Sequence, residues 1–193
     1  MELTSGKHWQ TLMEQLSQAS DEDALEAAKS LGGQHHEECI RSLIQFVRSQ
    51  QPPLRRELAL YALAWMHNPQ LIDTFIQILR DTDEMETVRG QAAEALGMLF
   101  DGNYEERNQH YYKAESALLD CVSDASAVVR FWCCYGLGNM RSHRAISQLE
   151  AIREQDHGLC PGWWYVSEEA EDALARISGQ PEAVRIPVHL RTD

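Results

Sequence analysis

The sequence predicts an all-α protein, an α-solenoid of about five helix pairs, and two observations carry this prediction. Residues 81–99 and 124–140 both place an acidic residue in a turn, then Val-Arg, then a helix of small and aliphatic residues that ends in Leu-Gly. Arg89 and Arg130 are 41 residues apart, and a repeated amphipathic pattern of this period is typical of stacked helical repeats. No strand-like stretch alternates with the helices, so no sheet is predicted.

Helical spacing of apolar residues and the turn residues between them define the N-terminal helices. Ser20 is a suitable N-cap for the second helix, whose first turn is acidic, and glycines at 32–33 end it. Prolines at 52–53 suit the start of the fourth helix, and Pro69 follows its end. The expected helices in this half are residues 7–19, 22–31, 36–49, 54–67 and 70–80.

The C-terminal half continues the pattern with two irregular insertions. A polar loop covers residues 101–110, and a second irregular stretch with Pro161 covers residues 156–162. The expected helices are residues 86–100, 110–122, 126–140, 143–155 and 163–178. The repeat domain is therefore expected at residues 1–178, with a tail at residues 179–193 of weak strand or extended character.

The second helices of the pairs align in one register. Small residues flank a leucine at the same place in four of them: Ala62-Leu63-Ala64, Ala95-Leu96-Gly97, Gly136-Leu137-Gly138 and Ala173-Leu174-Ala175. Small side chains let neighbouring helices approach closely, because packing distance depends on the residues at the contact. Another column holds Arg56, Arg89 and Arg130, with Ser167 in the last pair.

The arginine column is expected to form ion pairs along the stack. Asp124 precedes Arg130 by six residues, and Asp81 or Asp83 stands in the same role before Arg89. An acidic turn residue can pair with the arginine of its own repeat and of the neighbouring one, which predicts a partly buried ladder of charge-assisted hydrogen bonds.

These motifs resemble HEAT repeats, specifically the short bacterial type also seen in phycobilisome lyases. The resemblance covers most of residues 7–178 and is best at residues 70–100 and 110–140. It implies a curved right-handed superhelix of HEAT-like pairs, with the second helices lining a concave face that is commonly used for binding. It does not supply a substrate.

Composition narrows the classes of partner. A net charge of −13 disfavours nucleic acid as the partner, because phosphate attracts basic surfaces. The charge fits a basic protein partner or a well-solvated surface. No stretch approaches the roughly 18 apolar residues of a membrane span, and no signal peptide is evident. We therefore expect a cytoplasmic monomer, with its five cysteines buried and reduced.

Positions turned away from the small-residue column are the candidate binding surface. Aromatic residues there are typical interface contacts, although they could equally pack against the first helices or a loop. The candidate partner-binding residues are Tyr61, Trp65, Glu94, Met98, Trp132, Tyr135, Asn139, Glu169 and Asp172. Two aromatic groups at the insertions are alternative binding sites: Tyr104, Tyr111 and Tyr112, and Trp163, Trp164 and Tyr165.

No catalytic, cofactor or metal site is predicted. His36-Glu37 is similar to the metal-binding pairs of the HEAT-repeat enzyme deoxyhypusine hydroxylase, but no other repeat carries such a pair, and a di-metal site needs several. The sequence favours a non-catalytic binding scaffold, either an adaptor or an immunity-type inhibitor of a basic partner. The alternative is a HEAT-repeat enzyme of the bilin-lyase or metal-hydroxylase type.

Overall fold

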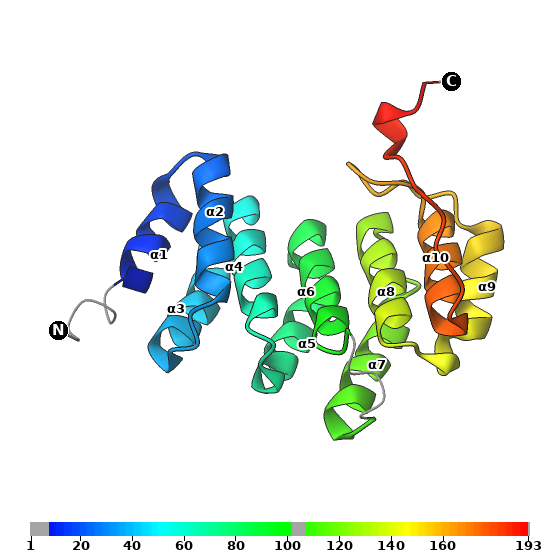
Figure 1. Cartoon of the computed structure of the whole chain (residues 1–193), viewed down its shortest axis with the longest axis horizontal. Coiled ribbons are helices and arrows are strands. Elements are labelled where there is room, and N and C mark those ends of the chain that lie inside the picture. Colours follow the sequence, from blue (N-terminus) through cyan, green and yellow to red (C-terminus); the bar gives the residue numbers. More distant parts are fainter. Residues whose placement is uncertain (1–7, 102–106, 193) are drawn as a thin grey trace.

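The computed structural model describes residues 8–101 and 107–192, and within these residues the chain is a stack of five helix pairs (Figure 1). The pairs are α1 (His8–Gln18) with α2 (Asp21–Gly32), α3 (Glu37–Val47) with α4 (Pro53–Trp65), α5 (Ile72–Arg80) with α6 (Glu86–Met98), α7 (Gln109–Cys121) with α8 (Ala127–Asn139), and α9 (Ile146–Gln155) with α10 (Val166–Ser178). The predicted all-α solenoid of five pairs is confirmed.

Three helix starts differ from the expectation. The helix expected at 143–155 opens with a 3₁₀ turn, His143–Ala145, and α9 follows from Ile146. The helix expected at 70–80 opens with a 3₁₀ turn, Pro69–Leu71, because the Asn68 side chain accepts a hydrogen bond from the Gln70 N–H. The helix expected at 163–178 begins only at Val166. There the Glu168 carboxylate accepts a hydrogen bond from the Tyr165 N–H at 3.1 Å, and this bond fixes the helix start at that turn.

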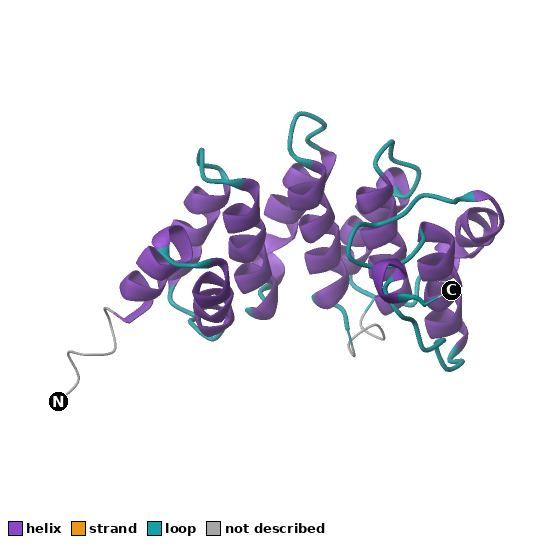
Figure 2. Ribbon diagram, turned by 90° about the horizontal axis from the view of Figure 1, so that it is seen from above, coloured by secondary structure: helices purple, strands orange, loops and turns teal. Residues whose placement is uncertain are grey.

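The second helices form one continuous layer. α2 packs against α4, α4 against α6, α6 against α8, and α8 against α10, so these five helices stand side by side (Figure 1). The first helices form a second layer along the same row, which is visible from above (Figure 2). We call the outer surface of α2, α4, α6, α8 and α10 the second-helix face.

The small-residue column lies where adjacent second helices touch. A Cβ added at Gly97 would lie 2.5 Å from the Cα of Gly136, and one added at Gly138 would lie 2.8 Å from the Cα of Ala173. Backbone therefore meets backbone at both contacts, and only glycine allows this approach. The predicted close packing at the Leu-Gly column is confirmed.

The arginine ladder exists, but each rung joins one repeat to the next. Arg89 Nη2 lies 2.5 Å from Asp124 Oδ2, and Arg130 Nε lies 2.6 Å from Asp156 Oδ2. Arg56 pairs with Glu84 in the same way. In its own repeat, the Arg130 guanidinium donates to the backbone carbonyls of Asp124 and Ala125, at 2.8 and 3.0 Å, and not to the Asp124 carboxylate.

Asp81 and Asp83 do not pair with Arg89, which corrects the expectation for that repeat. Both are exposed, and the Asp81 carboxylate accepts a hydrogen bond from the Asp83 N–H instead. The side chain of Arg89 points along the stack to Asp124 and also donates to the Leu79 carbonyl at 2.9 Å. A carboxylate of the next repeat therefore takes the place that the sequence assigned to the preceding turn.

The five cysteines are buried free thiols, as expected: Cys39, Cys121, Cys133, Cys134 and Cys160.

Tyr111 is fully buried and donates a hydrogen bond to the Met140 carbonyl at 3.0 Å, whereas Tyr112 is half exposed. Tyr104 lies outside the described residues. Within the described part of the chain, no helix has the length and apolar character needed to cross a membrane.

The C-terminal tail crosses α10 and is bound to it (Figure 1). Arg185 contacts Asp172 at 2.9 Å and Glu171 at 2.5 Å, and Arg191 contacts Glu168 at 2.8 Å. The tail ends in a short 3₁₀ turn, Val188–Leu190. No strand forms in the described tail, and ion pairs hold its extended backbone in place.

Candidate functional site

A groove of about 470 Å³ crosses the second-helix face from α2 to α8. Its size is within the range of ligand-binding clefts in proteins. The lining residues come from four second helices and from the loop before α10: Leu25, Leu54, Glu57, Leu58, Tyr61, Glu86, Thr87, Gln91, Glu94, Val128, Trp132, Cys160, Pro161 and Trp163. The surface is thus mostly apolar and aromatic, with acidic groups set into it.

Three carboxylates in the groove are held by neutral donors. Glu57 accepts a hydrogen bond from the Thr87 hydroxyl, and Glu86 accepts one from the Ser126 hydroxyl at 2.6 Å. Glu94 accepts a hydrogen bond from the Gln91 amide on its own helix.

Among the described residues none of the three carboxylates has a cationic partner, and no Lys, Arg or His lines the groove. The groove therefore carries uncompensated negative charge.

Glu94 is half buried near the middle of this groove. Burial raises the pKa of its carboxyl above the ordinary value, although the hydrogen bond from Gln91 opposes the shift. A buried carboxylate without a cation is costly, so binding of a cation at Glu94 would gain more energy than binding at an exposed carboxylate.

Trp132 and Trp163 form an aromatic corner at the α8 end of the groove. Their ring centroids are 5.4 Å apart at an angle of 82°. Trp132 leans from α8 onto α6 at Gly90, where an added Cβ would lie 2.7 Å from the Trp132 ring. Gly90 is one helical turn before Glu94, and Glu94 and Trp132 line the same groove.

The remaining predicted residues of α8 lie at cavities beside the groove. Tyr135 stacks under the Arg176 guanidinium, which is 4.9 Å from the ring centroid, and Asn139 accepts a hydrogen bond from Arg176 at 2.8 Å. Both line a polar cavity of about 570 Å³ that Glu182 also lines. These two residues therefore have partners within the chain.

Two predicted residues lie at the edges of the face. Trp65 is 49 % exposed and contacts Tyr61 at the end of α4. Met98 is half buried against the core at the end of α6. Tyr61, Glu94 and Trp132 are thus the predicted residues that the structure brings together in the groove.

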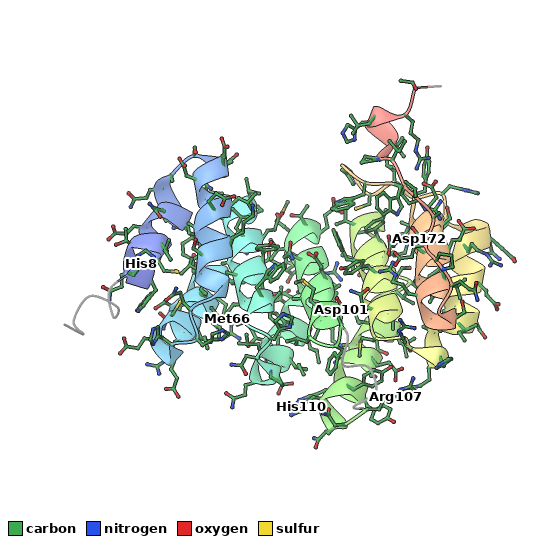
Figure 3. All side chains as sticks on the ribbon, viewed as in Figure 1. His8, Met66, Asp101, Arg107, His110 and Asp172 are labelled. Carbon is green, nitrogen blue, oxygen red and sulfur yellow. The ribbon has the colours of Figure 1, made fainter. Side chains whose placement is uncertain are left out.

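Glu169 and Asp172 are not exposed rim charges, which corrects the expectation for both. Their side chains are 1 % and 3 % exposed. Glu169 is enclosed by Arg176 and by the Trp164 indole N–H, and burial raises the pKa of Glu169 to about 7. Asp172, labelled on α10 in Figure 3, is covered by the tail, whose Arg185 donates to its carboxylate. The sequence register placed both on the correct face but did not reveal the chain segments that cover them.

The sequence prediction missed the first-turn residues of α4 and α6. Leu54 and Thr87 line the groove, and each lies seven residues before a predicted residue: Leu54 before Tyr61, and Thr87 before Glu94. Extending the predicted positions by two turns toward the helix N-terminus would have found both, because residues i and i+7 share a helix face.

The described part of the chain holds no group of three or more His, Cys, Asp or Glu side chains arranged to bind a metal. His36 precedes α3, and Glu37 is its first residue; both are exposed. The buried thiols have raised pKa values because burial disfavours the thiolate, and for Cys160 in the groove the pKa is about 12. A thiol with this pKa is a poor nucleophile at neutral pH.

Comparison with known proteins identifies a family for the N-terminal half of the chain. Residues 10–97 match the family model described as HEAT repeats. A search of the curated proteins found no match to the sequence. The fold is similar to that of a chain in the complex of CpcE and CpcF of phycocyanin lyase from Nostoc sp. PCC7120. That match has a TM-score of 0.65 and 20 % identity, and it covers 88 % of this chain and 95 % of that one.

An engineered protein gives a second structural match, with a TM-score of 0.51 and 19 % identity over 88 % of this chain and 79 % of that chain. Both identities are low, so these similarities show a shared fold. The family match covers the first pairs, and the later pairs continue the same stack of second helices. Residues 10–97 are therefore identified as HEAT repeats, and the later helix pairs share their stacked architecture.

Proposed function

We propose that the protein is a non-catalytic binding module whose groove on the second-helix face holds a basic segment of a partner protein. The observation that carries this proposal is the combination, in one groove, of aromatic walls with three carboxylates that lack a cationic partner among the described residues. Such a module would act as an adaptor or as an inhibitor that covers a basic surface of its partner.

Charge and shape support a protein partner in different ways. The net charge of −13 steers a basic partner toward the protein, and it repels nucleic acid. The rings of Tyr61, Trp132 and Trp163 offer apolar contact area in the groove, and aromatic side chains of this kind usually contribute much of the interface energy. HEAT repeats commonly bind proteins, and the CpcE–CpcF structure is itself a complex of two chains.

A crosslinking experiment tests the face and the partner together. A photoreactive benzoylphenylalanine replaces Tyr61 in the groove, and in a matched control it replaces Tyr112, half exposed on α7 in the other layer. We expect crosslinks to basic segments from the groove position only. Equal crosslinking from both positions, or crosslinking to acidic segments, would contradict the proposal.

Truncation of groove side chains then measures their contribution with the purified partner. Trp132→Ala should weaken binding by about 2 kcal/mol or more, mainly through faster dissociation. Tyr135→Ala should weaken binding less, because Arg176 already covers that ring. Tyr112→Ala should leave the affinity unchanged. A folded Trp132→Ala variant with wild-type affinity would move the search for the binding surface to the α7 side.

Glu57→Gln and Glu86→Gln test the electrostatic part of the proposal. Both carboxylates lie at the groove and are accessible to solvent. Their neutralisation should slow association and flatten its dependence on salt concentration, with a smaller effect on dissociation. The measurement is the association rate at two ionic strengths.

A further inference from the structure

The tail shows how the second-helix face holds an arginine. Arg185 lies on an extended segment and forms a two-point contact with Asp172: Nε to Oδ2 at 2.9 Å and Nη2 to Oδ1 at 3.1 Å. The Ala183 backbone N–H donates to the same carboxylate at 3.3 Å. An acidic residue on a second helix thus binds both the guanidinium and the backbone of a passing segment.

Glu94 occupies the same register position on α6 that Asp172 occupies on α10. Each directly precedes the small-residue triplet of its helix, Ala95-Leu96-Gly97 or Ala173-Leu174-Ala175. The helix contacts confirm this register: Gly97 meets Gly136 and Gly138 meets Ala173. In both contacts the partner lies two residues before its aligned position, so α6, α8 and α10 are stacked with the same offset.

The two positions differ in their occupant. Asp172 holds Arg185, whereas Glu94 is hydrogen-bonded only to the Gln91 amide within the described residues and faces the open groove. Trp132 lines the same groove as Glu94, and an aromatic ring offers a surface on which a planar cation can stack.

Arginine is the cation that this chain already places against aromatic rings. Arg176 lies 4.9 Å from the ring centroid of Tyr135 and pairs with Glu169, and Arg191 lies 6.0 Å from that of Tyr165 and pairs with Glu168. A guanidinium can bind a carboxylate through two N–H groups and stack on a ring at the same time, which an ammonium cannot do.

We propose that Glu94 and Trp132 form the arginine-binding position of the groove, which takes one arginine side chain from an extended segment of a partner protein. This inference rests on the proposed function, because it names the side chain that the groove recognises. The guanidinium would bind the Glu94 carboxylate and stack on the Trp132 ring, with Leu54 and Leu58 contacting apolar neighbours of the arginine.

Peptides with the sequence of the tail around Arg185 test the position. The probes are fluorescein-labelled Ala-Val-Xaa-Ile-Pro-Val, in which Xaa is arginine, lysine or the neutral isostere citrulline, and fluorescence anisotropy with the full-length protein gives the affinities. We expect the arginine peptide to bind about tenfold more tightly than the citrulline peptide, the typical effect of a charge-assisted hydrogen bond. The lysine peptide should lie between them.

Glu94→Gln should remove the preference for arginine over citrulline while the melting temperature stays within a few degrees of wild type. Glu150→Gln on α9, an exposed carboxylate outside the groove, is the matched control and should keep the preference. A Glu94→Gln variant that still prefers arginine would overturn the inference, as would equal binding of the arginine and citrulline peptides. Equal affinity for the arginine and lysine peptides would overturn the claim that the position prefers a guanidinium to an ammonium group.

The outcomes separate this inference from the proposed function. If Glu57→Gln or Glu86→Gln removes the preference and Glu94→Gln does not, the groove still binds basic segments, but the arginine position at Glu94 is wrong. If basic partner segments crosslink only at Tyr112, the proposed function is wrong, whatever the peptides show.

Discussion

At the residue scale, the arginine ladder shows what charge spacing in a sequence can and cannot predict. The column of Arg56, Arg89 and Arg130 was visible in the sequence, and ion pairs along the stack were expected from it. Pairing was expected both within a repeat and with the neighbouring one, and the side-chain ion pairs of the column join neighbouring repeats, because a guanidinium on a second helix reaches forward to the next turn. Sequence distance alone cannot distinguish these two turns.

The first prediction at this scale concerns Arg130. Its side chain is 18 % exposed and pairs with Asp156, which is 13 % exposed. Arg130→Ala should lower the free energy of unfolding by roughly 2–4 kcal/mol, because it leaves the Asp156 carboxylate partly buried without its cation. Urea denaturation measures the change. Arg80→Ala, which removes the exposed pair with Asp120, is the matched control and should cost less than about 1 kcal/mol.

The second prediction concerns pH. Burial alone would raise the pKa of Asp124 and Asp156, but hydrogen bonds from Arg89 and Arg130 outweigh it and lower both below the ordinary value of 3.8. The unfolded chain therefore binds protons more readily, so this stabilisation is complete above pH 3.8 and is lost as the pH falls through the folded-state pKa values. Asp156→Asn should unfold at acid pH with a smaller loss of stability than wild type. An identical slope of unfolding free energy against pH would contradict this.

At the element scale, the repeat pattern fixed which helices meet, and the loops between them determined the binding surface. The small-residue triplets predicted the contacts between second helices correctly, because the residue on a helix face follows from its position along the helix. The loop before α10 could not be predicted in the same way. Trp163 and Trp164 fit a helical pattern, yet they precede α10 and place Trp163 in the groove.

The prediction at this scale concerns the backbone contact between α8 and α10. Gly138→Leu should destabilise the fold by about 3 kcal/mol, at the upper end of typical overpacking, because even a Cβ there would lie 2.8 Å from a backbone atom that cannot rotate away. The melting temperature reports the change. Gly33→Ala is the control: its nearest neighbour would be 3.6 Å away, so its effect should stay within about 0.5 kcal/mol.

At the scale of the whole molecule, the stack distributes charge unevenly along the second-helix face. On α10, Glu168, Glu171 and Asp172 are neutralised by arginines of the tail, whereas the carboxylates of the groove on α4 and α6 have only neutral partners among the described residues. The tail thus compensates the C-terminal end of the face and leaves the groove as its acidic part. The sequence predicted an extended tail but gave no sign of this pairing, since the partners lie on a helix that ends before the tail begins.

The last prediction concerns the attachment of the tail. Arg185→Gln keeps an unbranched polar side chain but shortens it and removes its charge, so Asp172 loses its two-point contact and the tail loses its central attachment to α10. The amide of Val188, which donates to the Trp163 carbonyl at 2.9 Å, should then exchange with solvent faster, because local opening of the tail requires less free energy. Amides in the middle of α6 should keep their protection. Hydrogen exchange followed by mass spectrometry measures both regions in one experiment, and Arg153→Gln on the exposed side of α9 is the matched control. Unchanged exchange at Val188 in the Arg185→Gln variant would show that contacts other than the ion pairs of Arg185 hold the tail on the second-helix face.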